Sequence, residues 1–389
     1  MSRRFDAIVL GLGAMGAAAL WRLARRGVHA IGVDQFERAH ARGSSHGEAR
    51  ICRQAYFEHP DYVPLCRRAY ALWDELEQDA ARLNRRDGAM SPGAAIFERC
   101  GLLMFGPADA PMVSGVRRAC ETHGLAVEAL SHEAVRARWP QFDLDDDLTC
   151  LLESDAGYLR VEPAIRTMLA AAESLGAEVR TGAPVRDWSA DDRGARITLA
   201  HDGTTIEADR LIIAAGPWSG SLLRGLGLPF SVLRKVQLWF ACDDTRYANC
   251  PVFAYQSEGA FMYGFPMLEP GRIKLAEHTG REVVDDPGSP DRALRPDDIE
   301  RVAAFAARRL AGVSPRVVRH SVCMYTMTPD EHFVIDRHPQ YDSVSFAAGF
   351  SGHGFKFAPL VGSILADFAT AGATDEPIDF LRFSRSALR

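Results

Sequence analysis

The chain has 389 residues, 47% of them hydrophobic and 25% charged, which is enough to bury a large core as one large domain or two interleaved ones. Its 45 lysines and arginines against 51 aspartates and glutamates give a formal net charge of -6, so no uniformly basic surface exists to attract a phosphate backbone or anionic lipid. Nucleic acid and membrane partners are therefore not expected.

The N-terminal segment predicts a βαβ unit. Residues 5–10 are rich in Ile, Val and Leu, as in a strand that is buried on both faces. Residues 14–26 predict a helix that stops at Gly27, and residues 30–33 predict a second short apolar strand. No secretory signal precedes this unit, and arginines interrupt its helix well short of a membrane span. We therefore expect a cytoplasmic protein.

A GxGxxG turn, formed by Gly11, Gly13 and Gly16, connects the first strand to the helix. In this context the glycines permit a tight turn, close approach to a pyrophosphate and packing of helix on strand, and the helix N-terminus faces the phosphates. Asp34, at the end of the second strand, is placed to accept hydrogen bonds from an adenosine ribose, which disfavours a 2'-phosphorylated nucleotide. The turn predicts dinucleotide binding; the alternative is a glycine-rich turn without a ligand.

Beyond this unit the pattern of elements changes along the chain. Short aromatic strands recur between Lys235 and His278, which predicts an antiparallel sheet and with it a second domain. A polar, arginine-rich stretch after residues 100–105 indicates a separate layer. The other predicted elements are helices at residues 62–77, 161–175, 299–310 and 360–370, and strands at residues 196–199, 205–208, 210–214 and 344–347.

The cysteines and the later glycine turns bear on the cofactor. Eight cysteines are scattered without a CxxC pair, so neither a metal site nor a disulfide framework is expected. The strand at 210–214 runs into small residues, and a further glycine-rich turn occupies residues 349–354. Three distant glycine turns suit a long cofactor that lies across the sheet, which favours FAD over NAD.

Five longer motifs extend this interpretation. They are GSSHGEARICRQAY at Gly43–Tyr56, YGFP at Tyr263–Pro266, KLAEHTG at Lys274–Gly280, CMYTMTPDEHFVID at Cys323–Asp336 and AAGFSGHGFKFAP at Ala347–Pro359. In this order, and from Phe5 to the C-terminus, the chain resembles the monomeric sarcosine oxidase family, which also includes N-methyltryptophan oxidase and pipecolate oxidase. The resemblance implies an α/β fold, in which a Rossmann-type FAD-binding domain is interleaved with a substrate domain built on an antiparallel sheet.

The resemblance also assigns residues to the cofactor. Cys323, in the CMYT motif, is similar to the cysteine that carries the flavin through an 8α-S-cysteinyl linkage, and only a thiolate can attack the electron-poor flavin methyl group. The other cysteines are expected to be buried structural residues. For Arg50 and His46 a structural hydrogen bond is the alternative. The residues expected to contact the flavin are Ser44, His46, Arg50, Gly352, His353, Gly354 and Lys356.

The resemblance assigns further residues of the same motifs to the binding of substrate and to the reaction with oxygen. Arg53 and Lys356 look like the pair that binds the substrate carboxylate, because an arginine fork and an ammonium together fix one anion in orientation. Lys274 is similar to the lysine that faces the flavin N5 region, where its charge favours electron transfer to O2. Tyr263 and His278, like His353, resemble residues that shape and polarise the pocket, although each could be a satisfied core residue.

Two departures from the family bear on the substrate. Ala49 replaces a hydroxyl residue that sarcosine oxidases place beside the flavin, and Ala254 stands where they carry a bulky methionine in the pocket wall. Removing a side chain from the wall makes room for a substrate larger than sarcosine.

The sequence thus predicts an FAD-dependent oxidase of an N-methyl or cyclic amino acid with a free carboxylate, which passes electrons to O2. The alternatives are a flavin dehydrogenase that uses another acceptor, a flavin-retaining scaffold without turnover and a nicotinamide-dependent dehydrogenase. The resemblance suggests a monomer. The predicted FAD-binding domain comprises residues 1–84, 150–225 and 320–389, and the predicted substrate domain comprises residues 85–149 and 226–319.

Overall fold

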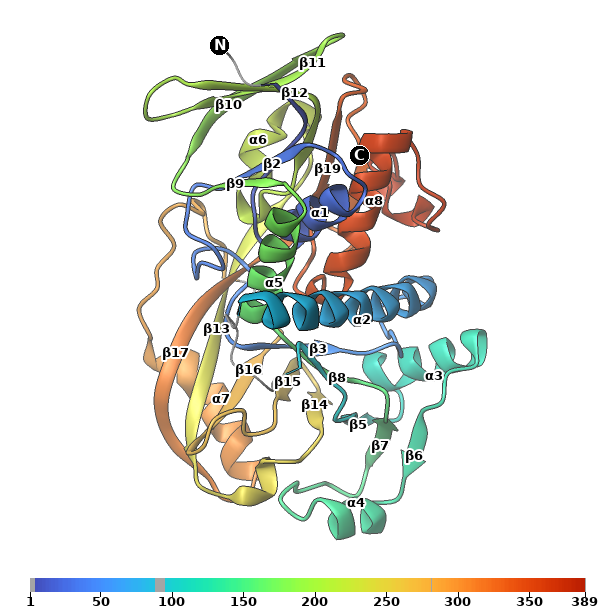
Figure 1. Cartoon of the computed structure of the whole chain (residues 1–389). Coiled ribbons are helices and arrows are strands. Elements are labelled where there is room, and N and C mark those ends of the chain that lie inside the picture. Colours follow the sequence, from blue (N-terminus) through green and yellow to red (C-terminus); the bar gives the residue numbers. More distant parts are fainter. Residues whose placement is uncertain (1–3, 88–94, 281, 389) are drawn as a thin grey trace.

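The computed structural model describes residues 4–87, 95–280 and 282–388. The predicted domain ranges also include residues 1–3, 88–94, 281 and 389, which lie outside the described residues. Two eight-stranded sheets and one three-stranded sheet organise the described residues. The first large sheet and its helices occupy the upper part of the molecule in Figure 1, and the second large sheet occupies the lower part. The fold is therefore α/β, as the sequence predicts.

The first sheet is mostly parallel around its central strands. Its order is β10-β11-β12-β1-β2-β9, with β19 paired to the carboxyl end of β12 and β18 paired to β19. The strands β1, β2, β9, β12 and β19 run parallel, whereas β10, β11 and β18 are antiparallel additions. The strands are β1 Arg4–Leu10, β2 Ala30–Val33, β9 Glu178–Arg180, β10 Val185–Asp191, β11 Gly194–Leu199, β12 Thr205–Ile213, β18 Val334–Arg337 and β19 Val344–Ala348.

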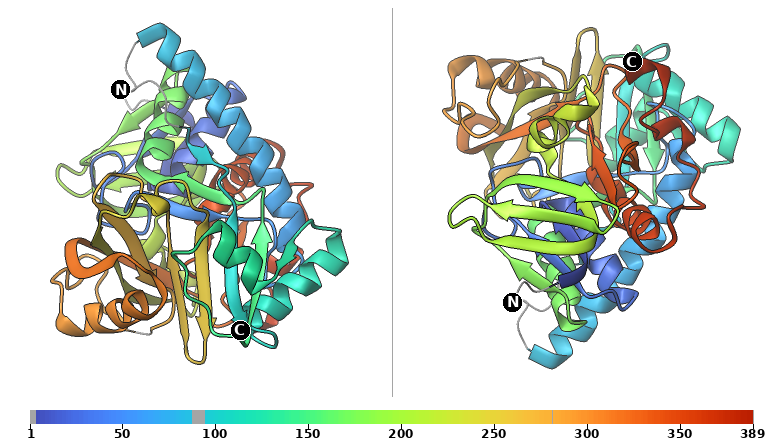
Figure 2. Two further views of the ribbon diagram at one scale, coloured as in Figure 1. Left: turned by 90° about the horizontal axis from the view of Figure 1, so that it is seen from below. Right: turned by 90° about the horizontal axis from the view of Figure 1, so that it is seen from above.

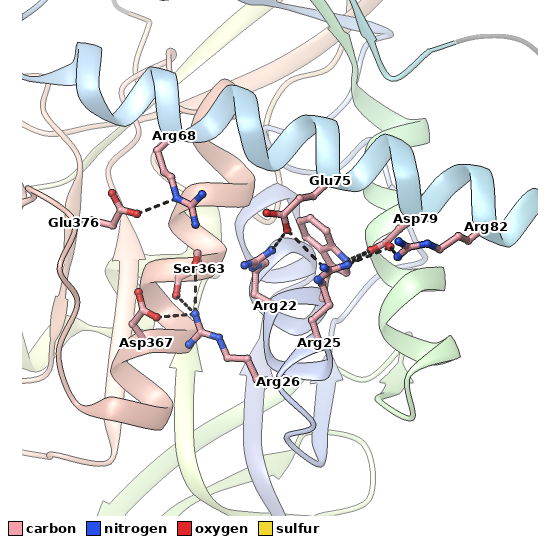
Figure 3. A network of polar contacts seen from close by, with 11 residues as sticks. Arg22, Arg25, Arg26, Arg68, Glu75, Asp79, Arg82, Ser363, Asp367 and Glu376 are labelled. Carbon is pink, nitrogen blue, oxygen red and sulfur yellow. Dashed lines mark hydrogen bonds and ion pairs between the residues drawn. The ribbon is translucent and has the colours of Figure 1, made fainter.

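Helices cover this sheet and meet one another through apolar and polar contacts. They are α1 Ala14–Arg25, α2 Tyr62–Asp87, α5 Val161–Ser174 and α8 Ala358–Ala371, with the short α6 Ser219–Leu222 nearby. Arginines in the last turn of α1, and Arg26 directly after it, form ion pairs with α2 and α8 in the network that Figure 3 shows. Arg22 pairs with Glu75 at 2.6 Å, and Arg26 pairs with Asp367 at 2.6 Å. These pairs fix the helices on the outer side of a shared core.

The second sheet is almost wholly antiparallel, as the aromatic strands predict. Its order is β17-β13-β16-β15-β14-β5-β7-β6, and only the β5–β14 pair is parallel among the pairings of its described strands. β13 and β17 are long and curved (Figure 1). The strands are β5 Leu102–Pro107, β6 Glu128–Leu130, β7 Leu148–Glu153, β13 Ser231–Cys242, β14 Val252–Ser257, β15 Ala260–Gly264, β16 Arg272–Glu277 and β17 Val313–Met327.

Smaller elements complete the fold. Three short strands, β3 Ala49–Cys52, β4 Phe97–Glu98 and β8 Gly157–Arg160, form the third sheet. The helices beside the second sheet are α3 Pro111–His123, α4 His132–Arg138 and α7 Pro296–Arg309. Among the described residues, the structure contains no helix that is both long and apolar enough to cross a bilayer.

One predicted helix and two predicted strands differ from the structure. The helix predicted at 62–77 continues to Asp87 as one long helix (Figure 2), because residues 78–87 contain no glycine or proline to end it. The strands predicted at 205–208 and 210–214 form one strand, β12. A break at Asp209 is wrong because pairing with β1 continues on both sides of it, at Ala208 and Arg210.

Gly362 shows how closely α1 and α8 approach. A Cβ at Gly362 would lie 2.4 Å from the backbone carbon of Ala18 and 2.7 Å from its Cβ. Gly362→Ala is expected to lower the free energy of unfolding by about 1–3 kcal/mol, because overpacking outweighs the gain in helix propensity. Gly220→Ala is the matched control, since nothing lies within 4 Å of that position. Equal denaturation midpoints for the two variants would contradict the expected close packing.

Candidate active site

A cavity of about 300 Å³ connects the two large sheets. The carboxyl ends of β1, β2 and β12 open onto it through Leu10, Val33 and Ala214. The turn after β19 lines it from Gly349 to Lys356. In open α/β sheets, ligands bind in the crevice outside the carboxyl ends of the strands. The cavity therefore occupies the position where such a sheet binds a ligand.

The glycine turn forms one end of the cavity. Gly11 has φ 91°, and a Cβ there would lie 2.6 Å from the carbonyl oxygen of Ala214. A Cβ at Gly16 would lie 1.7 Å from the carbonyl oxygen of Gly11. The Asp34 carboxylate accepts a hydrogen bond from the Leu12 amide at 2.6 Å. Asp34 thus holds the turn while its side chain remains at the cavity wall, where a ribose could add further hydrogen bonds.

The start of α1 meets the segment that follows β2. Gly13 precedes α1, and the Ala14 amide donates to Ser45 Oγ at 3.2 Å. Ser44 and Ser45 both line the cavity beside this helix N-terminus. The backbone amides there form the kind of site that binds phosphate oxygens.

One face of the second sheet carries several of the predicted site residues. The strand register places Ala254 opposite Met104 and Tyr263, and Tyr263 opposite Ala276. Two residues before Ala276, Lys274 shares this face, because side chains alternate along a strand. The same face continues across β13 and β17, where Lys235 lies opposite Cys323. Residues from distant parts of the chain thus lie on one surface.

The segment that ends in β3 packs on this surface. Arg50, which lies on β3, donates to the carbonyl oxygen of Ser44 at 3.1 Å, and its guanidinium is 3.6 Å from Cys323 Sγ. Lys274 Nζ donates to the carbonyl oxygens of Gly47 and Ala49. Arg50 lines the cavity, whereas Lys274 and Cys323 lie one layer deeper and contact residues 44–50.

Lys274 is buried rather than at an exposed strand edge. Its side chain has a relative exposure of 2%. Burial, followed by the charge of Arg50, lowers the pKa of Lys274 well below its usual value. The rings of Phe265 and Trp239 lie 4.8 Å and 5.5 Å from the ammonium and favour its charged form.

Arg53 and Lys356 come together at the opposite end of the cavity. Both cations lie against the ring of Tyr56, with the Arg53 guanidinium carbon 4.3 Å and Lys356 Nζ 5.0 Å from its centroid. Arg53 Nη2 also donates to both carboxylate oxygens of Glu58, with both contacts at 2.7 Å. Lys356 Nζ donates to the carbonyl oxygen of His353 at 2.7 Å. A ligand carboxylate would therefore compete with Glu58 for Arg53.

The predicted histidines are neutral in this environment. Burial lowers the pKa of His353 to about 3 and that of His278 to about 4. His353 Nδ1 contacts the Tyr56 hydroxyl, and His278 Nδ1 is 3.3 Å from the Tyr325 hydroxyl. His46 is also buried, with its pKa lowered to about 3, and its Nδ1 lies 3.2 Å from Ser321 Oγ. These rings can donate or accept hydrogen bonds but carry no charge near neutral pH.

Tyr263, Gly352 and Gly354 line the same cavity. A Cβ at Gly352 would lie 2.3 Å from the ring of Tyr325, and one at Gly354 would lie 2.4 Å from the ring of Phe350. These close approaches explain the two glycines as packing positions under the turn. Burial raises the pKa of the Tyr263 phenol, so Tyr263 remains a neutral hydroxyl.

Several residues of the site carry no signal that sequence reasoning used. Tyr56 and Glu58 follow Arg53 within one short segment. The acid five residues beyond a predicted carboxylate-binding arginine was the available sign that the two residues form a pair. Glu162, at the start of α5, accepts from the Gly47 amide at 2.6 Å. Gln237 lies beside Arg50, with 3.4 Å between its Oε1 and the guanidinium. Neither of these last two positions belongs to a motif.

Comparisons with known proteins agree with this geometry. A family model described as FAD dependent oxidoreductase matches residues 6–368. The chain is 36% identical over 396 residues to monomeric sarcosine oxidase from Arthrobacter sp. (strain TE1826), covering 100% of this chain and 98% of that protein. It is 36% identical over 389 residues to N-methyl-L-tryptophan oxidase from Escherichia coli O139:H28 (strain E24377A / ETEC), covering 98% and 99%. NikD, an amino acid oxidase essential for nikkomycin biosynthesis, has the same fold, with a TM-score of 0.85, 23% identity and 98% of both chains covered.

The environment of Lys356 generates a pH prediction. Burial, followed by the charge of Arg53, lowers the pKa of Lys356 to about 8. The ammonium is therefore present below about pH 8 and lost above it. We expect the dissociation constant of a small carboxylate such as acetate to rise as pH increases through this range, by up to about tenfold per unit. Titration calorimetry would measure it, and Lys356→Met should bind more weakly with a flat profile. A wild-type affinity that stays constant from pH 7 to 9.5 would contradict the expectation.

Proposed function

The chain belongs to the family of FAD-dependent oxidoreductases, and on that premise we propose that it oxidises the C–N bond of a secondary amino acid and passes the electrons to O2. The observation that carries the proposal is the arrangement around one cavity. The glycine turn and Asp34 lie at one end, Arg53 and Lys356 lie at the other, and Lys274 lies beneath the segment between them. This order matches a dinucleotide, a reacting centre and an anionic substrate group.

The residues around the cavity fit FAD. At Gly11 only a hydrogen side chain leaves room, and the amides at the start of α1 face the cavity. The Thr326 hydroxyl lines the cavity and has no hydrogen-bond partner among the described residues, although it is buried. A buried polar group of this kind is normally satisfied, so a bound ligand would supply the partner. FAD bound here would accept a hydride from the substrate and transfer the electrons to O2.

We further propose that Cys323 holds the flavin covalently. Its sulfur is buried, 3.4 Å from the Ser44 carbonyl oxygen and 3.6 Å from the Arg50 guanidinium. Such a linkage forms through the sulfur atom of the cysteine, which is the nucleophile in this chemistry. Met324, Tyr325 and Thr326, which follow Cys323 directly, line the cavity.

Substrate binding is assigned to Arg53 and Lys356. An arginine fork and an ammonium on either side of one carboxylate would fix its orientation and with it the position of the C–H bond that breaks. Because His278 and His353 are neutral near pH 7, the cations at this end of the cavity are Arg53 and Lys356, and Glu58 is the anion that the substrate displaces. The amine would react in its neutral form, and the proposal requires no general base.

The proposed substrate is larger than sarcosine. Ala254 lies between Met104 and Tyr263 in the strand register and lines the cavity with them, so we expect its small side chain to leave a depression in that face. Met112, Phe261 and Phe57 close the depression from α3 and from neighbouring segments, so its lining is apolar. An apolar compartment beside a carboxylate site suits an amino acid with a bulky apolar side chain.

The predicted division into an FAD-binding domain and a substrate domain belongs to this proposal. The first sheet and the turn at Gly349–Lys356 would hold the cofactor, and the second sheet would form the substrate wall. The runner-up is a dehydrogenase that uses another electron acceptor, and it shares the same cofactor end of the site.

Acid precipitation of the purified protein tests the cofactor, and H2O2 release tests the reaction. We expect yellow colour in the pellet of the wild type and in the supernatant of Cys323→Ser. In stopped-flow measurements, Lys274→Met should slow reoxidation by O2 by a factor on the order of 10²–10³ and leave flavin reduction nearly unchanged. Amino acid oxidation without H2O2 would identify the dehydrogenase. Equal slowing of both steps would refute the role of Lys274, and a colourless protein would refute the proposal.

Ala254→Met tests the substrate size. Filling the depression should lower kcat/KM for N-methylphenylalanine by a factor of about 10–200 and change kcat/KM for sarcosine much less, because the pocket would lose room for the side chain. Ala248→Met, at an exposed position in the loop before β14, is the control and should affect neither substrate. A wild-type preference for sarcosine over bulkier amino acids would overturn the assignment.

A further inference from the structure

We propose that Glu48 and Glu162 are positioning residues that keep Lys274 charged and aimed at the reacting centre. The inference rests on the proposed function, in which Lys274 promotes the reaction with O2. Glu48 lies within the Gly43–Tyr56 motif but has no role assigned there, and Glu162 belongs to none of the motifs. Both glutamates act on Lys274 through the turn at residues 47–49.

Two carbonyl groups hold Lys274, and they flank a single residue. The ammonium donates to the carbonyl oxygens of Gly47 and Ala49, the latter at 2.9 Å. For both carbonyls to point at one ammonium, the chain must turn sharply at Glu48. Glu48 has φ 69°, in the left-handed region that residues other than glycine rarely occupy. Such a conformation persists only where surrounding contacts enforce it.

The side chain of Glu48 supplies part of that enforcement. Its Oε2 accepts from Trp239 Nε1 at 2.7 Å, and its Oε1 accepts from Arg272 at 3.0 Å and from Arg319. Trp239 lies directly opposite Lys274 in the register of β13 and β16. The indole therefore contacts both the carboxylate and the ammonium, and it links the position of Glu48 to that of Lys274.

Glu162 holds the same turn from the other side. Its carboxylate accepts from the amides of Gly47 at 2.6 Å and Glu48 at 3.1 Å. The Val161 amide donates to the carbonyl oxygen of Glu48 at 2.9 Å. The start of α5 thus satisfies the outward-facing peptide groups of the turn. The carbonyl oxygens of Gly47 and Ala49 face Lys274, and they also accept from the Ala49 amide and from Arg50, each at 2.9 Å.

The charges around Lys274 come from several elements. Arg50 on β3 opposes its protonation, whereas Glu48 and Glu162 favour it. His46, on the same segment, is neutral near pH 7. Because burial already disfavours the ammonium, the carboxylates decide whether it stays charged.

Removing the charge of Glu48 has a second effect. Arg272 and Arg319 both pair with this carboxylate. Without it, Arg319 would lose this partner, and Arg272 would retain its pair with Glu269. Glu48→Gln keeps the size of the side chain and an oxygen that can accept from Trp239. The substitution therefore removes charge while it retains most of the shape.

The test is the pH dependence of Glu48→Gln compared with wild type. A reaction that needs the ammonium is fast below the pKa of Lys274 and slows as pH rises through it. A lower pKa in the variant moves this decline to lower pH, by about one unit or more. Stopped-flow reoxidation would measure the decline. The pH titration of flavin absorbance in the resting enzyme is a second readout, because loss of a neighbouring charge alters the flavin spectrum.

Glu269→Gln is the matched control. Glu269 pairs with the same Arg272 at 2.6 Å and is largely exposed, and within the described part of the chain it forms no hydrogen bond with Trp239 or residues 47–49. Glu269→Gln should shift neither pH profile, whereas Glu162→Gln should shift both profiles in the same direction as Glu48→Gln. Unshifted profiles in both the Glu48 and Glu162 variants, or an equal shift in Glu269→Gln, would overturn the inference. If Glu48→Gln does not fold, Glu162→Gln decides the question.

Failure of the proposed function would be visible separately. A wild-type enzyme that is reduced by an amino acid but does not react with O2 would refute the oxidase assignment on its own. The absorbance titration would still report the charge of Lys274 in that case. Slower flavin reduction together with an unshifted pH profile would identify Glu48 as a structural brace, which contradicts the inference.

Discussion

Burial of cationic side chains beside one cavity is the constraint on which this site depends. Arg50, Arg53, Lys274 and Lys356 all lie within or directly under the cavity wall. A buried charge is stable only with nearby partners. Carbonyl oxygens hold Arg50, Lys274 and Lys356, and Glu58 holds Arg53. The loops of the site follow the paths that bring those oxygens to the cations.

The two sheets contribute different groups to the contacts that hold these cations. The second sheet supplies a rigid surface from which Lys274 and Cys323 project. The segment between β2 and α2 and the turn between β19 and α8 belong to connections of the first sheet, and they supply carbonyl groups and the other cations. Because the halves are interleaved along the chain, Lys274 on the second sheet is hydrogen-bonded by carbonyl groups of the segment that follows β2 of the first sheet. The site therefore forms only when both sheets are folded.

The cavity is chemically asymmetric, and the asymmetry supports the proposed reaction. One end offers cations to a carboxylate, and the wall around Ala254 is apolar. The neighbouring imidazoles are neutral because burial lowers their pKa values, so they orient groups without competing for the anion. The same burial lowers the pKa values of Lys274 and Lys356. The carboxylate and carbonyl groups around these two lysines are therefore important for function.

The sequence alone determined the α/β class, the FAD-dependent family and the βαβ unit, because these follow from local periodicity and from motifs whose chemistry requires fixed residues. The helix predicted at 62–77 was too short and the predicted break in β12 was wrong, since a helix without a breaker and a strand with a paired neighbour both extend through tertiary contacts. Only the tertiary structure placed Glu58 on Arg53, and Glu48 and Glu162 around the carbonyls that hold Lys274. The physical reason is that the tertiary structure decides which groups surround a buried charge. Residues as far apart in the chain as Glu48 and Lys274 share no sequence pattern that would reveal that they are neighbours.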